Sequence, residues 1–322
     1  MGGVVEVRRP VDVAQLGTRL GNADVVQFCE PLTGVEYRSL AALLVDHPKV
    51  LLRAYGFNDG LATLRFLRWF PRLRRFSVAG LHHLTDLAPL DQLNAHLEFL
   101  DIGETRKPLD LAPVAAFHEL RALRIVAHRR GLAELLNANP GLQALALWRL
   151  PVDQVLPVMA LPHLQSLALT LGSLTTSAWV AQFPALRYLA LREVRRLVDL
   201  AAVTHLPALR WLWLDALAVE QLPDFTASTR LLRVDCTEMR HLQHPWSLRG
   251  LAAAPHLREL LVTESRLPVD AFVPFVDHPI LERAGVGLGS HRRNRDAENL
   301  LRRPPPHSEA DFAKTHGLLR IL

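Results

Sequence analysis

One short apolar pattern, P-x-L-x-x-L-x-L, recurs along most of the chain and restricts the fold more than any other feature. PALRYLALREV, which begins at Pro184, is a clear copy. The copies that begin at Pro140, Pro162, Pro184 and Pro207 follow one another in steps of 22, 22 and 23 residues. The ten copies begin at Pro71, Ala95, His118, Pro140, Pro162, Pro184, Pro207, Thr229, Pro255 and Pro279. Such a period predicts a solenoid, a fold that grows by adding turns.

Within each copy the leucines alternate with other residues, as a β-strand requires. In LRYLALR, Leu189 and Leu191 fall on one face, and Tyr188, Ala190 and Arg192 fall on the other. Because one strand cannot bury its apolar face alone, we expect the strands to stack into a parallel sheet. The return segments have a period of three, which favours short 3₁₀ or helical turns. After this strand the apolar positions are Val194, Leu197, Leu200, Val203 and Leu206.

The pattern resembles the leucine-rich-repeat family, whose repeats carry L-x-x-L-x-L at the strand. The resemblance covers about residues 50 to 290, and the repeat length is most similar to the short, internalin-like type of bacterial leucine-rich-repeat proteins. It implies an α/β fold, a leucine-rich-repeat solenoid. In that solenoid a curved right-handed stack carries a parallel sheet on its concave side and 3₁₀ turns or short helices on its convex side.

The repeats depart from the family at one position. The family usually has an asparagine three residues after the last strand leucine, where the side chain bonds backbone groups of neighbouring turns. This chain lacks that asparagine ladder, so we expect the backbone groups at the bend to find other partners. The residues at this position include Leu81, Leu150, Gly172, Val194, Leu217 and Met239.

Three segments follow from the extent of the repeats: an N-terminal cap at 1–47, about ten repeat turns at 48–290, and a C-terminal cap and tail at 291–322. Caps cover the last rungs of a solenoid. In the first, VVEVRRPVDV and VVQF are strand-like, and SLAALLVDH predicts a helix with Ser39 as its N-cap. In the last, we expect a helix from Asp296 to Arg302, broken by the prolines at 304–306 and followed by a partly mobile tail.

The residues between and beside the strand leucines point out of the stack, so we expect them to form an exposed binding face. Large aromatic side chains gather there on nearby turns, with charged side chains around them. Trp, Tyr and Arg dominate protein interfaces, although aromatic residues also stabilise strands by packing on the next rung, and both interpretations stay open. The candidate partner-binding residues are Trp148, Tyr188, Arg192, Trp211, Trp213, Asp215, Arg233 and Asp235.

No sequence pattern predicts catalysis. The chain lacks a G-x-S-x-G elbow, an H-E-x-x-H pair, a phosphate-binding loop and a dinucleotide fingerprint. His241 and His244 have a helical spacing but no third zinc ligand, and Cys29 beside Glu30 would need a catalytic domain for which the cap has no room. We therefore expect no enzyme activity, no cofactor and no metal site.

The net charge of +5 leaves one alternative, an electrostatic nucleic-acid binder that uses its arginine-rich surface. The basic runs at 72–75, 128–130 and 292–295 do not share a strand face, so a protein partner of unknown identity is the preferred interpretation. Cys29 and Cys236 lack metal-site spacing and favour a reducing compartment. The chain shows no apolar signal segment and no membrane-spanning run, which predicts a cytoplasmic protein without a membrane partner.

Overall fold

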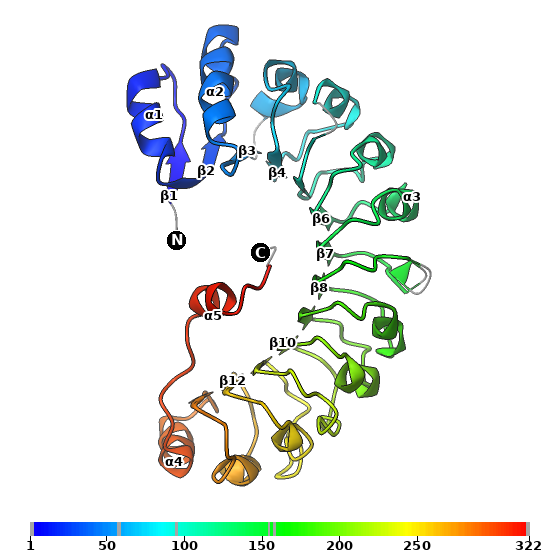
Figure 1. Ribbon diagram of the computed structural model, residues 1–322, viewed down its shortest axis with the longest axis vertical. Helices are drawn as coiled ribbons and strands as arrows, with labels where there is room; N and C mark the ends of the chain where they lie inside the picture. The colour runs from blue at the N-terminus through cyan, green and yellow to red at the C-terminus, as the bar shows by residue number, and fades with distance from the viewer. Residues whose placement is uncertain (1–2, 57–58, 94–95, 154, 157–158, 320–322) are drawn as a thin grey trace. The chain divides into compact units, whose positions relative to one another are not determined.

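Each of the ten copies forms one parallel strand in the computed structural model, which describes residues 3–56, 59–93, 96–153, 155–156 and 159–319. The strands belong to two compact units, an N-terminal unit, Met1–Leu142, and a C-terminal unit, Gln143–Leu322. In both, the strands line one side and short helices and 3₁₀ turns line the other (Figure 1). The predicted parallel sheet with tight return turns is confirmed.

The N-terminal unit pairs its strands in chain order, each parallel to the next. The strands are β1 Gly3–Glu6, β2 Ala23–Phe28, β3 Leu51–Tyr55, β4 Arg75–Ala79, β5 Phe99–Ile102 and β6 Ala122–Val126. The return segments contain α1 Val13–Leu20, α2 Gly34–Asp46, α3 Leu132–Asn137, and 3₁₀ turns η1 Asp59–Leu61, η2 Arg65–Trp69, η3 Ala88–Gln92 and η4 Ala112–Ala116. Since β1 and β2 precede the repeats, the predicted cap region extends the sheet by two strand-helix turns.

Helix α2 begins earlier than the sequence pattern suggested, and the prediction of Ser39 as its N-cap is wrong. Thr33 is the N-cap: its hydroxyl accepts the Glu36 N–H, and the Glu36 carboxylate accepts the Thr33 N–H at 2.7 Å. This reciprocal capping box satisfies two N–H groups that a helix start otherwise leaves unpaired. Ser39 lies inside the helix, where all backbone donors already have partners.

The strands of the C-terminal unit also pair in chain order, each parallel to the next and without a register shift. Its strands are β7 Ala144–Trp148, β8 Ser166–Thr170, β9 Tyr188–Arg192, β10 Trp211–Asp215, β11 Arg233–Thr237, β12 Glu259–Thr263 and β13 Arg283–Val286. Its return segments contain the 3₁₀ turns η6 Ala178–Gln182, η7 Ala201–His205, η8 Leu251–Ala253 and η9 Val269–Phe275. The period of three in the sequence therefore does correspond to 3₁₀ turns.

The core of this unit is a set of leucine rows that run across the strands. Leu189 pairs in register with Leu212, and Leu191 pairs with Leu214; all four side chains are fully buried. The apolar residues of the return segment close the core from the other side, and Val203 in η7 is one of them. The opposite side of the sheet, which carries the residues between the leucines, is called the outward face below.

Backbone groups take the place of an asparagine ladder at the bends after β7 to β11. The residue after each of these strands has a positive φ, for example 57° at Arg149 and 52° at Glu193. This left-handed conformation turns the N–H of Glu193 toward the Asp215 carbonyl of the next strand, at 2.8 Å. The ladder position itself is then free to be apolar, as at Val194, whose side chain is fully buried.

The chain ends in two helices, α4 His291–Leu301 and α5 Glu309–Thr315. Helix α4 begins five residues before the predicted Asp296 and ends at Arg302, which has a left-handed φ of 51°. The prolines at 304–306 follow outside any helix, as expected. Residues 304–318, called the C-terminal segment below, do not leave the sheet as a tail. No helix in the described residues is long and apolar enough to cross a membrane.

Candidate functional site

The predicted partner-binding residues lie on the outward face of the C-terminal unit, in rows set by the strand register. Tyr188, Trp211 and Arg233 are paired across β9, β10 and β11 and form one row. Trp213 and Asp235 are paired in the next row. Arg192, Asp215 and Trp148 belong to a third row, which also includes Thr170 of β8. The alternation read from the sequence placed all of these residues on the correct side of the sheet.

Their expected exposure is wrong for five of the eight. Asp215 is 9% exposed. The other four are buried more deeply, with a fractional exposure of 3% for Tyr188, 0% for Trp211, 1% for Arg233 and 1% for Asp235. The C-terminal segment causes this burial, since α5 lies on the strand side of the unit, away from the 3₁₀ turns (Figure 1). The sequence offered a signal that was missed: the Ser-Glu-Ala-Asp-Phe stretch from Ser308 begins with a helix-capping pattern.

The apolar part of this contact is centred on Phe312 of α5. Its ring lies edge-on to Trp211, with 5.3 Å between ring centroids, and Trp211 in turn lies 5.0 Å from Tyr188. Phe312 is 2% exposed, and Ala313 and Leu318 belong to the same buried cluster. The aromatic residues predicted to hold a partner therefore already form a closed cluster with a segment of this chain.

A buried ion network forms the polar part of the contact. The Arg233 guanidinium lies 2.9 Å from Asp235 and 3.3 Å from Glu259, and it donates to the His307 carbonyl at 2.8 Å. The Trp211 indole N–H donates to Asp235 at 2.9 Å. Burial raises the pKa of the Asp235 carboxyl, an effect that the adjacent Arg233 charge opposes. The network keeps every charge in contact with an opposite one, which buried ions require.

The remaining candidate residues form an accessible charged and aromatic area beside the C-terminal segment. Arg192 is exposed, pairs with Asp215 at 3.1 Å, and lies 4.9 Å over the Trp213 ring. Arg192 and Asp215 also line a pocket of about 520 Å³ at the ends of β9, β10 and β11. Trp213 and Trp148 are partly exposed. Arg192, Trp213 and Trp148 are therefore the candidate residues whose side chains stay accessible, and the buried Asp215 lies beneath the Arg192 guanidinium.

Polar side chains also converge in the N-terminal unit, where the Tyr55 hydroxyl and the Gln27 amide donate to one Glu6 carboxylate oxygen at 3.0 Å and 2.7 Å. No three His, Cys, Asp or Glu side chains in the described part of the chain are placed to hold a metal ion. His244 stacks on Trp246 with 4.4 Å between ring centroids. Cys236 is fully buried on β11, and burial raises the pKa of its thiol well above the ordinary value, which disfavours the reactive thiolate.

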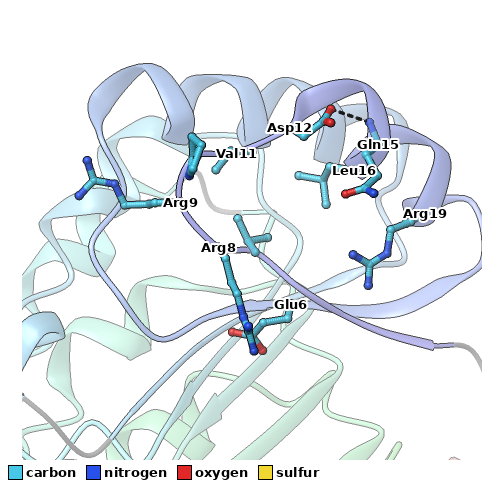
Figure 2. A pocket seen from close by; sticks show the side chains of 10 residues that line it. Glu6, Arg8, Arg9, Val11, Asp12, Gln15, Leu16 and Arg19 are labelled. Atoms are coloured by element: carbon cyan, nitrogen blue, oxygen red, sulfur yellow. Dashed lines mark hydrogen bonds between the residues drawn. The ribbon is translucent and has the colours of Figure 1, made fainter.

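A second pocket, of about 420 Å³, lies in the N-terminal unit between β1 and α1, and Figure 2 shows its labelled side chains. Arg8, Arg9 and Arg19 line it, but so do the carboxylates of Glu6 and Asp12. Asp12 accepts the Gln15 N–H at the start of α1, the dashed line in Figure 2. Sequence reasoning missed this pocket, whose mixed charge does not favour a polyanion.

The three basic runs of the sequence are partly neutralised by carboxylates. Arg74 lies 2.7 Å from Glu98, and Arg130 lies 2.9 Å from Asp110. Arg292 lies 3.9 Å from Asp296 within α4. Nucleic-acid binding needs arginines that are available to phosphates. These ion pairs therefore weaken the interpretation of the protein as a nucleic-acid binder.

Comparisons with known proteins support the fold. No protein-family model matches the chain, and no curated protein matches its sequence. Among solved structures, an internalin of Listeria monocytogenes is similar with a TM-score of 0.54 and 15% identity, covering 88% of this chain and 85% of the internalin.

Two further structures are more distant. A leucine-rich-repeat protein of Leptospira interrogans has a TM-score of 0.39 and 14% identity, covering 90% of this chain and 91% of that one. The TLR13–ssRNA13 complex has a TM-score of 0.49 and 14% identity, covering 94% of this chain and 53% of TLR13. At such low identity a likeness shows the fold alone, and that fold is the leucine-rich-repeat stack predicted from the sequence.

Proposed function

We propose that this protein is a non-enzymatic interaction module that binds a protein partner on the outward face of its C-terminal unit. The observation that supports this most is that the face already holds a protein segment through buried contacts. Phe312 packs on Trp211, and Arg233 binds the backbone of His307. A surface that holds one helix through aromatic and arginine contacts has the chemistry that protein interfaces use for their strongest contacts.

The accessible residues beside the C-terminal segment extend this binding face. Arg192 and Trp213 combine a charge with an aromatic plane at 4.9 Å, and Asp215 holds the guanidinium in place at 3.1 Å. Trp148 adds a second partly exposed indole, in the row that contains Arg192 and Asp215. Aromatic residues with two rotatable side-chain bonds lose little entropy on binding, which suits them to interface contacts.

We also propose that the protein works in a reducing compartment such as the cytoplasm. Cys29 and Cys236 are both free thiols. Cys236 is fully buried in the leucine core, where it behaves as a small apolar residue. Two unpaired cysteines in separate units are typical of proteins that are not exposed to oxidising conditions.

The test is affinity capture from the source cell with immobilised protein. The wild type is compared with an Arg192→Ala/Trp213→Ala variant, and Arg249→Ala is the control, because Arg249 is exposed in the return segment between β11 and β12 and does not belong to the candidate residues. The double variant should bind the partner at least about 30-fold more weakly than the wild type does. Loss of two interface contacts should cost about 2 kcal/mol or more, which corresponds to that factor.

The double variant and Arg249→Ala must both keep the wild-type circular dichroism spectrum. Equal capture of the same protein by the wild type and the double variant would contradict binding at this face. Recovery of nucleic acid alone, with loss of binding at higher salt, would favour the electrostatic alternative instead.

A further inference from the structure

We propose that the C-terminal segment is a built-in competitor of the protein-binding face, and that the partner presents a segment of the same chemistry. That chemistry is an extended, proline-led stretch followed by a short capped helix with one buried phenylalanine. This inference rests on the proposed function and adds both the kind of partner and its regulation. It follows from how the segment is held, from what it contributes to the fold, and from its position on the candidate residues.

The C-terminal segment has the form of an independent short ligand. Ser308 caps the start of α5 by accepting the Asp311 N–H at 3.2 Å. Gly317, with a φ of 57°, ends it, and the Leu318 N–H returns to the Ala313 carbonyl at 2.8 Å. Because a helix of seven residues is not stable alone in water, contact with the face must stabilise it. The segment is therefore folded by docking, as a peptide ligand would be.

One side chain provides the main apolar anchor. Phe312 contacts both the Trp211 ring, at 5.3 Å between centroids, and the Arg233 guanidinium, whose central carbon lies 5.2 Å from the Phe312 ring centroid. Ala313 beside it is small enough to sit close to the sheet and is 9% exposed. A partner segment needs a phenylalanine followed by a small residue to fill the same cluster.

Most polar contacts of the C-terminal segment go to its backbone, so they do not depend on its side chains. The Ala284 N–H donates to the Pro304 carbonyl at 2.9 Å, and the Arg283 side chain donates to the Pro305 carbonyl at 2.8 Å. Two further arginine side chains donate to the His316 carbonyl at the end of α5, Arg187 at 3.4 Å and Arg210 at 3.3 Å.

These backbone contacts restrict the shape of the occupant more than its sequence. Positive side chains at the carbonyl end of a helix are also favoured by its dipole. Any segment with the same backbone path would make the same hydrogen bonds. The face is therefore able to exchange its own segment for that of another protein.

The apolar core at the end of the stack is covered by α4, whereas the C-terminal segment accepts the Ala284 N–H of the last strand and lies on the outward face. Helix α4 packs beside the last strand and buries Ala297 and Leu301. The leucine rows lie on the opposite side of the sheet from Phe312. The segment instead covers Tyr188, Trp211 and Arg233, the residue types that dominate interfaces. An element that is not needed to close the core but covers these residues is suited to competition.

The experiment measures whether the face binds the C-terminal segment when it is supplied separately. A fluorescently labelled synthetic peptide with the sequence of residues 303–319 is titrated with the full chain, and anisotropy is recorded. In the wild type the attached segment competes at high effective concentration, so the peptide binds weakly. Phe312→Ala weakens the attached segment only, and we expect the peptide to bind it about 30-fold more tightly.

Two controls isolate the anchor. Leu319→Ala changes an exposed residue directly after the C-terminal segment, and this variant should bind the peptide as weakly as the wild type does. A peptide with alanine in place of its phenylalanine should fail to bind the Phe312→Ala protein. Ala313→Asp is a second release variant that places a charge in the buried cluster and should act in the same direction as Phe312→Ala.

Three results would overturn the proposal. The first is that the peptide binds the two folded release variants no more tightly than it binds the wild type, or does not bind them at all. Both release variants could lose the cooperative unfolding of the wild type, which would make the segment part of the core. Sedimentation could show a wild-type dimer that Phe312→Ala dissociates, which would make the segment of a second copy the occupant.

The peptide titration involves no partner from the cell, so its outcome is independent of the capture experiment. If the peptide fails while a partner still depends on Arg192 and Trp213, the competitor inference is wrong and the binding face stands. Capture is therefore also run with Phe312→Ala, in which the face is released. If the peptide binds this variant while neither it nor the wild type captures a partner, the segment docks as described and the proposed function is wrong.

Discussion

Replacing Arg233 by methionine should destabilise the C-terminal unit strongly, because the guanidinium neutralises two buried carboxylates. Its side chain is 1% exposed, and those of Asp235 and Glu259 are 2% and 5% exposed. Methionine fills a similar volume but leaves Asp235 without a counter-charge and leaves Glu259 with only the His307 contacts, at 2.5 Å from the imidazole Nδ1. Removing one partner of a buried ion pair costs about 3–5 kcal/mol, so the free energy of unfolding at neutral pH should fall by that amount.

The matched control is Arg240→Met. Arg240 lies 3.0 Å from Glu238, a distance close to that of the Arg233 pair, but the two side chains are 64% and 38% exposed. Solvent screens such a pair, so the free energy of unfolding should change by less than about 0.5 kcal/mol. The assay is urea unfolding followed by far-ultraviolet circular dichroism, with the two variants and the wild type measured at the same pH.

The pH dependence gives an independent check of the cause. Burial already raises the pKa of Asp235, and loss of Arg233 should raise it further. A carboxyl whose pKa is higher in the folded state than in the unfolded state loses stability as the pH rises through that range. The deficit of Arg233→Met should therefore shrink as the pH falls below neutral. A loss below about 1 kcal/mol, or a deficit independent of pH, would refute this reasoning.

Three further predictions concern the N-terminal unit, each measured as the free energy of unfolding in urea. His128 is buried and accepts a backbone N–H at Nδ1, and burial lowers its pKa. Stability should therefore be full above the ordinary histidine pKa and fall as the pH drops from about 7.5 to about 5.5. His128→Leu should cost about 2 kcal/mol at the higher pH and reduce that slope, and an unchanged slope would contradict the assignment. Thr33→Ala should cost about 1 kcal/mol through loss of the capping box, whereas Ser39→Ala should cost little; the reverse order would mean that Ser39 is the cap after all. Gly103→Ala should cost about 1–3 kcal/mol, because the new Cβ would lie 2.7 Å from the Val78 carbonyl oxygen of the preceding strand. Gly141→Ala is the control, because a Cβ at that position would meet no atom within 4 Å. Equal effects of the two substitutions would argue against the clash.

Much of the fold could be predicted because repeat proteins encode it locally. The leucines of PALRYLALREV and the residues every third position after them specify a strand, a bend and a tight return. Repetition then forces the strands into parallel register, since each unit can bury its leucines only against its neighbours. The sidedness of Trp211 and Arg233 follows from the same alternation.

The bend after each strand was predicted only in part. The missing asparagine ladder indicated that backbone groups needed other partners, but not which ones. The positive φ at Glu193 lets its N–H reach the next strand directly, and that conformation has no clear signature at a glutamate. His128 supplies a side-chain substitute in one turn, where its Nε2 lies 2.9 Å from the Gly103 carbonyl oxygen.

By itself, the sequence determined the strands, their parallel stacking, the 3₁₀ returns and the face on which the candidate residues lie, because each depends on residues a few positions apart. Only the tertiary structure decided which of those residues are accessible. Arg233 meets His307 across 74 positions of sequence, and Arg187 meets His316 across 129. No periodic pattern carries such a contact, since it depends on where α4 directs the chain and on how Phe312 fits the Trp211 ring.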